Sequence, residues 1–203
     1  MSSEGTMRSR KPDGYWKTYY DNGVIKSEGN RKEFQLDSVW IFYGKEGEIA
    51  MEINYKEGVK LGVKRRYGVG GVILSEEIFS NDKKYGVCKY YYINGSIEKL
   101  VTYENDFKQG KSLTYSEEGV IIVILTYEND FIVNQEFINR RDKRGLKTGV
   151  WKVFHENGRI KIEGKYNLDK REGFFREFSM DGKLLNTYKY ENGELVENVI
   201  EFT

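Results

Sequence analysis

Side chains able to do catalytic chemistry are scarce in this chain. It holds one histidine, His155, and one cysteine, Cys88. A zinc site takes several Cys or His ligands, and a nucleophilic dyad needs both groups within hydrogen-bond reach. Because neither set can be assembled here, we expect His155 to be an ordinary strand residue and Cys88 a packed one. The sequence predicts no catalytic residue, no metal site and no cofactor.

Carboxylates recur at a regular spacing. The repeated residues are Asp82, Asp106, Asp130 and Asp169, with Glu104 and Glu128 two residues before two of them. In stacked copies these groups would form an acidic column able to hold a cation. Aspartate is also a common turn former that tolerates left-handed backbone, and Gly58 and Gly193 replace it in other copies. We favour the turn role.

Basic and aromatic residues are the candidates for contact with a partner. A basic stretch between Ile132 and Thr148 contains Arg140, Arg141, Lys143, Arg144 and Lys147. It is either a solvated loop or an interaction loop, since insertions in repeat proteins tend to map to binding faces. We favour the loop and expect deletion of residues 139–146 to leave folding intact. The candidate partner-binding residues are Trp16, Trp40, Arg140, Arg141, Arg144 and Trp151.

A 24-residue repeat must position all of these side chains. Copies begin at Gly14, Ser38, Gly62, Gly86, Gly110, Gly149 and Gly173, and we count each first residue as place 0. Place 5 is always aromatic, place 9 is always Gly, place 11 is Ile or Leu, and place 17 is aromatic in six of the seven copies. A fixed period of this length indicates an array in which each unit contacts mainly its neighbours.

Each copy reads as a β-hairpin. Asn22-Gly23 and Asn94-Gly95 are strong turn signals between aromatic and β-branched runs. Glu46-Gly47 does not suit a two-residue turn, which needs positive φ at both residues. A three-residue loop needs only one left-handed Gly, and it pairs place 5 with place 11. We therefore predict the three-residue loop.

Side chains alternate between the two faces of a strand. Counting along the copies predicts that places 1, 5, 11, 15 and 17 share one face, while places 12, 14 and 16 share the other. The stretch from Val120 to Leu125 is apolar on both faces. It is either a covered central strand, which we favour, or a partner surface.

The predicted fold is all-β: an elongated, twisted antiparallel sheet of about seven tandem 24-residue β-hairpin repeats. Residues 1–13 are expected to be a disordered tail, 14–133 repeats 1–5, 134–148 a basic insertion, and 149–203 repeats 6–7 with the C-terminal end. So many strands in one open sheet usually twist, curl or split.

The net charge and the cysteine count limit the classes of partner and the cellular compartment that we expect. The net charge of +1 gives no argument for nucleic acid or an anionic membrane. One cysteine permits a reducing compartment, and no segment has the apolar length of a membrane span or a signal-peptide core. We expect a cytoplasmic protein that binds another protein, with a second copy of the chain as an alternative partner.

The repeat resembles a known family. Tyr55-x-x-Gly58-x-x-x-Gly62 followed by Tyr67-x-x-x-Gly71-x-Ile73 is similar to the MORN repeat in its bacterial variant form, and residues 16–23 and 151–158 are the nearest matches. The resemblance covers about residues 14–196. It implies an antitoxin or immunity protein that binds and blocks a bacterial toxin. The alternative that it implies is a membrane- or cytoskeleton-associated scaffold. The repeat defines no catalytic residue.

Overall fold

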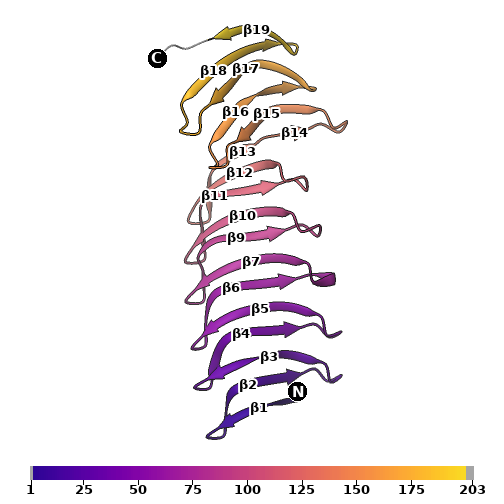
Figure 1. Ribbon diagram of the computed structural model, residues 1–203, viewed down its shortest axis with the longest axis vertical. Coiled ribbons are helices and arrows are strands. Elements are labelled where there is room, and N and C mark those ends of the chain that lie inside the picture. The colour runs from indigo at the N-terminus through magenta and orange to yellow at the C-terminus, as the bar shows by residue number, and fades with distance from the viewer. Residues whose placement is uncertain (1, 200–203) are drawn as a thin grey trace. The chain divides into compact units, whose positions relative to one another are not determined.

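The computed structural model describes residues 2–199, and antiparallel strands make up most of it (Figure 1). The first sheet has 13 strands, joined in chain order except that the short β8 pairs with β7. Its strands are β1 (Ser3–Arg8), β2 (Lys11–Tyr19), β3 (Ile25–Lys32), β4 (Gln35–Tyr43), β5 (Ile49–Lys56), β6 (Val59–Tyr67), β7 (Ile73–Ser80), β8 (Lys83–Lys84), β9 (Gly86–Tyr91), β10 (Ile97–Glu104), β11 (Phe107–Tyr115), β12 (Ile121–Glu128) and β13 (Phe131–Phe137). The 3-10 turn η1 (Val69–Gly71) lies between β6 and β7.

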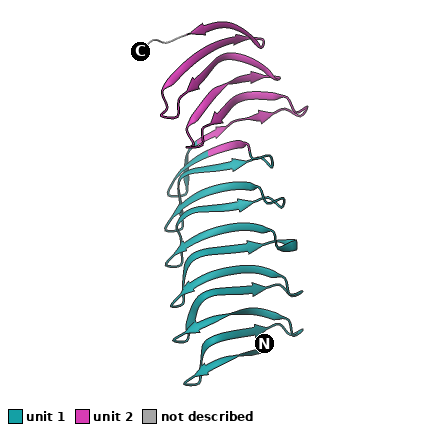
Figure 2. Cartoon of the chain, in the orientation of Figure 1, with its two compact units in different colours: residues 1–119, 125–134 teal, residues 120–124, 135–203 magenta. Residues whose placement is uncertain are grey.

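The second sheet has six strands in chain order. They are β14 (Arg140–Arg141), β15 (Lys147–Phe154), β16 (Ile160–Asn167), β17 (Lys170–Phe178), β18 (Leu184–Glu191) and β19 (Glu194–Val199). The chain divides into two compact units, residues 1–119 with 125–134 and residues 120–124 with 135–203 (Figure 2). Within each unit the strands form one layer, and the all-β array of hairpins is confirmed. Two sheets take the place of one continuous sheet.

The first turn of each repeat is the predicted three-residue loop. The Tyr20 amide donates to the Val24 carbonyl over 2.8 Å, the Gly23 amide donates to the Tyr20 carbonyl over 3.0 Å, and Gly23 has a φ of 84°. Place 5 pairs with place 11, as in Tyr19 with Ile25. Place 9 is therefore always Gly because only Gly adopts this left-handed conformation without strain.

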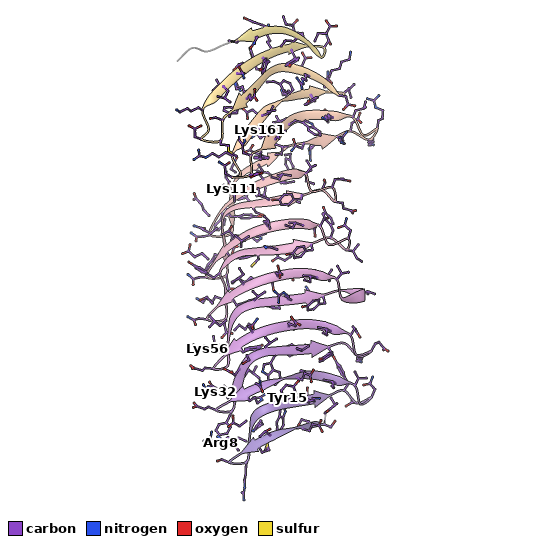
Figure 3. The ribbon with its side chains drawn as sticks, viewed as in Figure 1. Arg8, Tyr15, Lys32, Lys56, Lys111 and Lys161 are labelled. Atoms are coloured by element: carbon purple, nitrogen blue, oxygen red, sulfur yellow. The ribbon has the colours of Figure 1, made fainter. Side chains whose placement is uncertain are left out.

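The second turn has two residues, both with positive φ, such as Asn81 at 50° and Asp82 at 65°. The Lys60 amide of the preceding hairpin donates to Oδ1 of Asp82 over 2.9 Å, and the Asp82 amide donates back to the Lys60 carbonyl. The same bridge recurs at Asp106, Asp130 and Asp169. The turn role of these aspartates is confirmed, because each carboxylate caps a backbone amide of its neighbour. Two labelled lysines show where these turns lie. Lys32 is the last residue of β3 and Lys56 the last residue of β5, and both lie on the side of the sheet where the second turns connect the strands (Figure 3).

The predicted assignment of places to faces is wrong. Phe42 pairs with Met51 while Tyr43 pairs with Ile49, so one extra residue sits in β5 beside the first turn. A one-residue bulge reverses which face each later residue occupies. The Tyr43 hydroxyl consequently donates to the carboxylate of Glu28, at place 14, over 2.5 Å. Place 5 shares its face with place 14, and places 2, 15 and 17 share the other.

Directly opposed pairs of places 15 and 2 build the core. Gly29 faces Trp40, which is 3% exposed, and Ile53 faces Lys64. A Cβ at Gly29 would lie 2.6 Å from the Trp40 ring, so the glycine makes room for the indole. In the other unit, a Cβ at Gly164 would lie 2.5 Å from the Phe175 ring. A large ring at place 2 thus requires Gly across the strand pair.

The amino terminus differs from the expected disordered tail. Ser3–Arg8 forms β1 and pairs with β2, with Gly5 opposite Trp16. A Cβ at Gly5 would lie 2.4 Å from the Trp16 ring, so β1 covers that indole. The sequence signal was missed because the tail has little apolar content. Met1 and residues 200–203, parts of the predicted tail and C-terminal end, lie outside the described residues.

The basic insertion is ordered structure in place of the solvated loop that we favoured. Ile138 is 2% exposed and Asn139 is 7% exposed. The Asn139 amide group donates to the carbonyls of Ile121 (2.9 Å) and Lys152 (3.0 Å), and its Oδ1 accepts from the Lys152 amide (2.7 Å). This side chain therefore completes the hydrogen bonding of two backbone segments.

The rest of the insertion is a hairpin. The Asp142 amide donates to the Leu146 carbonyl and the Gly145 amide donates to the Asp142 carbonyl, with a Gly145 φ of 84°. This geometry repeats the first turn of the regular copies. The apolar strand from Val120 to Leu125 is a central strand: β12 has a strand on each side in the sheet order, and Ile124 is 8% exposed.

Candidate partner-binding surface

Places 2, 15 and 17 define what we call the ring face. In the unit that contains β15–β19, four rings stand in a row on it. Trp151 meets Tyr166 at 5.7 Å between centroids, Tyr166 meets Phe175 at 5.3 Å, and Phe175 meets Tyr190 at 5.2 Å. All three contacts are edge-to-face, the arrangement that aromatic quadrupoles favour. Phe175 is buried, while the other three rings are partly exposed.

Basic side chains lie over this row. The Lys147 ammonium is 4.6 Å from the Trp151 ring centroid and 4.8 Å from that of Tyr166. The Arg171 guanidinium lies 5.2 Å from the Phe175 centroid and donates to the Tyr190 hydroxyl over 2.6 Å. Hydrogen bonding to Tyr166 is the main cause that raises the pKa of Arg171. The row therefore presents aromatic surface and fixed positive charge together.

The three predicted arginines lie in three different environments. The guanidinium of Arg141 lies 5.5 Å from the Trp151 ring centroid, which brings these two predicted residues together. Arg140 stacks on Phe137, and Arg144 pairs with Asp142 at 3.0 Å. Of the three arginines, Arg141 is thus the one that joins the ring row.

The other two predicted tryptophans are packed. Trp40 is buried and its Nε1 donates to the Asn30 carbonyl over 2.8 Å, with the Arg31 guanidinium over its ring. Trp16 is partly exposed beneath β1. Burial places Trp40 in the core, so it is not an accessible contact residue.

Sequence reasoning missed several members of the row. They are Tyr166, Phe175, Tyr190 and Arg171, together with the role of Lys147. One signal would have found all of them except Phe175: a basic residue 19 positions before the place 17 aromatic. The same spacing puts Lys60 over Phe79, Lys84 over Tyr103 and Lys108 over Tyr127, at 5.1–5.3 Å from the ring centroids.

A buried ion pair replaces an apolar pair in the third repeat. Glu77, at place 15, is 6% exposed and lies 3.0 Å from the Lys64 ammonium at place 2, and it also contacts Lys84. Burial by itself would raise the pKa of Glu77. Hydrogen bonds from Lys84 and Lys64 outweigh that effect, so the pKa lies below its usual value.

This pair predicts a pH dependence of stability. Because the folded pKa of Glu77 is depressed, its contribution is present above the unfolded glutamate pKa of about 4.3 and is lost as pH falls through the folded value. Glu77→Gln should be less stable at pH 7 and should lose less stability than the parent protein between pH 5 and pH 3. Urea unfolding across this range measures the difference. Glu46→Gln, at an exposed turn, is the control and should follow the parent profile; identical slopes for all three proteins would contradict the prediction.

The remaining chemistry-bearing residues have structural partners. Cys88 is fully buried, and burial raises the pKa of its thiol. His155 Nε2 lies 2.9 Å from the Phe178 carbonyl, matching the bonds from Tyr20 to Tyr43 and from Tyr92 to Tyr115 that join successive hairpins. Within residues 2–199, no group of three His, Cys, Asp or Glu side chains converges as a metal site would require. The same residues hold no helix with the length and apolarity to cross a membrane.

The repeat geometry agrees with a comparison against known families. Residues 12–33, 84–105, 108–129 and 147–168 each match the family model described as MORN repeat variant. These four segments are MORN repeats of the variant form. Three of them begin with the lysine that lies over a place 17 aromatic, namely Lys84, Lys108 and Lys147. No curated protein matches the chain.

The copies outside the matched segments keep the geometry of the MORN variant repeats. In the copies that begin at Ser38, Gly62 and Gly173, place 5 pairs with place 11: Tyr43 with Ile49, Tyr67 with Ile73, and Phe178 with Leu184. The hairpin array is therefore longer than the segments that the family model matches.

Proposed function

We propose that this MORN variant protein is a non-catalytic module that binds another protein through its ring face. The observation that carries the proposal is the row of Trp151, Tyr166 and Tyr190 held under Lys147 and Arg171. Tyr, Trp and Arg are the residues most enriched among interface hot spots. Edge-to-face packing fixes the rings before binding, which reduces the entropy lost on association.

The charge of the row indicates the chemistry of the partner. Arg141, Lys147 and Arg171 all direct positive groups onto the rings, and the nearby surface of a partner would be acidic to complement them. The most specific form of the proposal is an immunity or antitoxin role in the cytoplasm, in which the partner is a bacterial toxin. Its support is the family resemblance.

Affinity capture tests the binding function. The tagged chain, incubated with a lysate of its native host, should retain a protein identified by mass spectrometry. Lys147→Ala combined with Arg171→Ala should weaken that interaction at least about 30-fold, the loss expected from removing hot-spot contacts. Circular dichroism should show unchanged strand content.

A matched pair provides the control. Lys161→Ala combined with Lys183→Ala removes the same charge at exposed positions away from the row, and Lys161 is labelled in Figure 3. An equal loss in both double variants would show that net charge alone governs binding. If the chain floats with liposomes in a density gradient and captures no protein, the scaffold alternative is favoured.

The immunity role has its own test. The protein encoded by the neighbouring gene is expressed alone and together with this chain. If that protein is a toxin that the chain blocks, it should stop growth when expressed alone, and co-expression of the chain should restore growth. A captured protein whose toxicity is unchanged by saturating amounts of the chain would contradict the immunity role and leave protein binding in place.

A further inference from the structure

We propose that the hollow above Ser112 receives an aromatic side chain of the partner protein, from a position next to an acidic residue. This inference rests on the proposed protein-binding function and names one contact within it. The hollow has a volume of about 310 Å³ and lies in the unit that contains β9–β11. Its wall includes Val101, Tyr103, Lys108, Ser112, Leu125 and Tyr127. Lys111, labelled in Figure 3, precedes Ser112 on β11 and is not part of the wall.

The protein itself shows what such a site holds. In the seventh repeat, Phe175 at place 2 packs between Tyr166 and Tyr190, with Arg171 over the ring. The same places in the fifth repeat are Ser112, Tyr103, Tyr127 and Lys108. Both tyrosines and the cation are therefore present, whereas the central ring is missing.

The missing ring follows from the size of the opposed pair. Val101 pairs directly with Ser112, and these two side chains together are smaller than the Gly29 and Trp40 pair. Ser112 is 3% exposed, and its hydroxyl donates to the Leu100 carbonyl over 2.9 Å. Because this hydroxyl proton is already bonded, Ser112, at the floor of the hollow, does not need a polar group on the ligand as its acceptor. Aromatic and aliphatic walls favour a planar apolar group.

The rim adds a preference for negative charge. Lys99 and Lys108 line the hollow together with Glu98, and within residues 2–199 neither lysine makes an ion pair. The local charge is therefore positive by one unit, counting two lysines against one glutamate. A carboxylate beside the inserted ring would complement this rim. An acidic–aromatic pair on a partner surface meets both requirements.

A titration with short peptides tests the site. The probe is acetyl-Glu-Trp-amide, added to the full isotope-labelled chain and followed by NMR. We expect saturable shifts at Ser112 and Tyr127, with intermolecular contacts from the indole protons to the rings of Tyr103 and Tyr127. Acetyl-Gln-Trp-amide should bind more weakly and acetyl-Glu-Ala-amide should cause no shift at these residues.

A variant whose hollow is filled by its own aromatic ring, called the filled variant, serves as the control protein. Val101→Gly combined with Ser112→Phe copies the Gly164 and Phe175 arrangement and should weaken peptide binding at least about tenfold, since the inserted ring occupies the site. Ser112→Ala should bind like the parent. Equal binding by the filled variant, or the lack of indole contacts with Tyr103 and Tyr127 in the parent protein, would overturn the inference. The contacts in the parent decide the matter even if the filled variant does not fold.

The two proposals fail in different ways. Partner capture by the filled variant at the parent level would contradict this inference alone. Peptide binding in the hollow without any captured protein would contradict the proposed function while supporting the site.

Discussion

Trp40→Ala should lower the free energy of unfolding by about 3–5 kcal/mol, the range for removal of a buried large aromatic side chain. Trp40 is 3% exposed, opposes Gly29 and donates its indole N–H to the Asn30 carbonyl. Alanine cannot fill the space that Gly29 leaves, so the change creates a cavity and removes the donor to the Asn30 carbonyl. Urea unfolding followed by circular dichroism measures the loss.

Val39→Ala is the control for this prediction. Val39 precedes Trp40 on β4, faces the opposite side and is 44% exposed. Its truncation should cost less than about 1 kcal/mol, because an exposed side chain loses little contact. Similar losses for both variants would mean that the ring face is not the core face.

Asn139→Ala should lower the free energy of unfolding by about 2–4 kcal/mol. Its side chain makes three hydrogen bonds to the backbone of Ile121 and Lys152, and the residue is 7% exposed. Removal leaves these backbone groups without partners, at about 1–3 kcal/mol for each group that stays buried. Deletion of residues 139–146 should then abolish soluble folding, the reverse of what a solvated loop would give.

Asn134→Ala tests whether the effect belongs to the buried amide. Asn134 lies on β13 and is exposed, so its replacement should change stability by less than about 0.5 kcal/mol. Asn139→Asp extends the comparison, because a carboxylate accepts from the Lys152 amide but cannot donate to the two carbonyls. Parent-like stability in Asn139→Ala would contradict the bridging role.

The turns could be predicted because local chemistry determines them. Gly23 must adopt positive φ, and Asp82 tolerates it, whatever the surrounding strands do. The period of 24 residues then orders the hairpins, and both features agree with the structure. Cys88 was placed correctly for the same reason, since it occupies a place whose packing role the other copies reveal. His155 was predicted as a strand residue, but it lies one residue beyond β15, where its ring bonds to the Phe178 carbonyl.

The faces could not be predicted by counting residues. One extra residue beside each first turn reverses the alternation, so Tyr43 faces Glu28 and not Ile53. This error hid the ring face, and with it the row from Trp151 to Tyr190 and the hollow above Ser112. The same wrong assignment of faces left Trp40 among the predicted contact residues. In the structure its indole is buried in the core, because Gly29 on the paired strand has no side chain to exclude it.

The amino-acid sequence by itself determined the hairpin, its turns and the 24-residue period, because each depends on residues close together in the chain. The tertiary structure alone decided which side chains share a face, that Asn139 joins two backbone segments, and where a ring is missing from a cage of tyrosines. Those features depend on bulges and on pairs of side chains that oppose each other on different strands. A hollow forms only where the combined volume of such a pair is too small to fill the space between its neighbours.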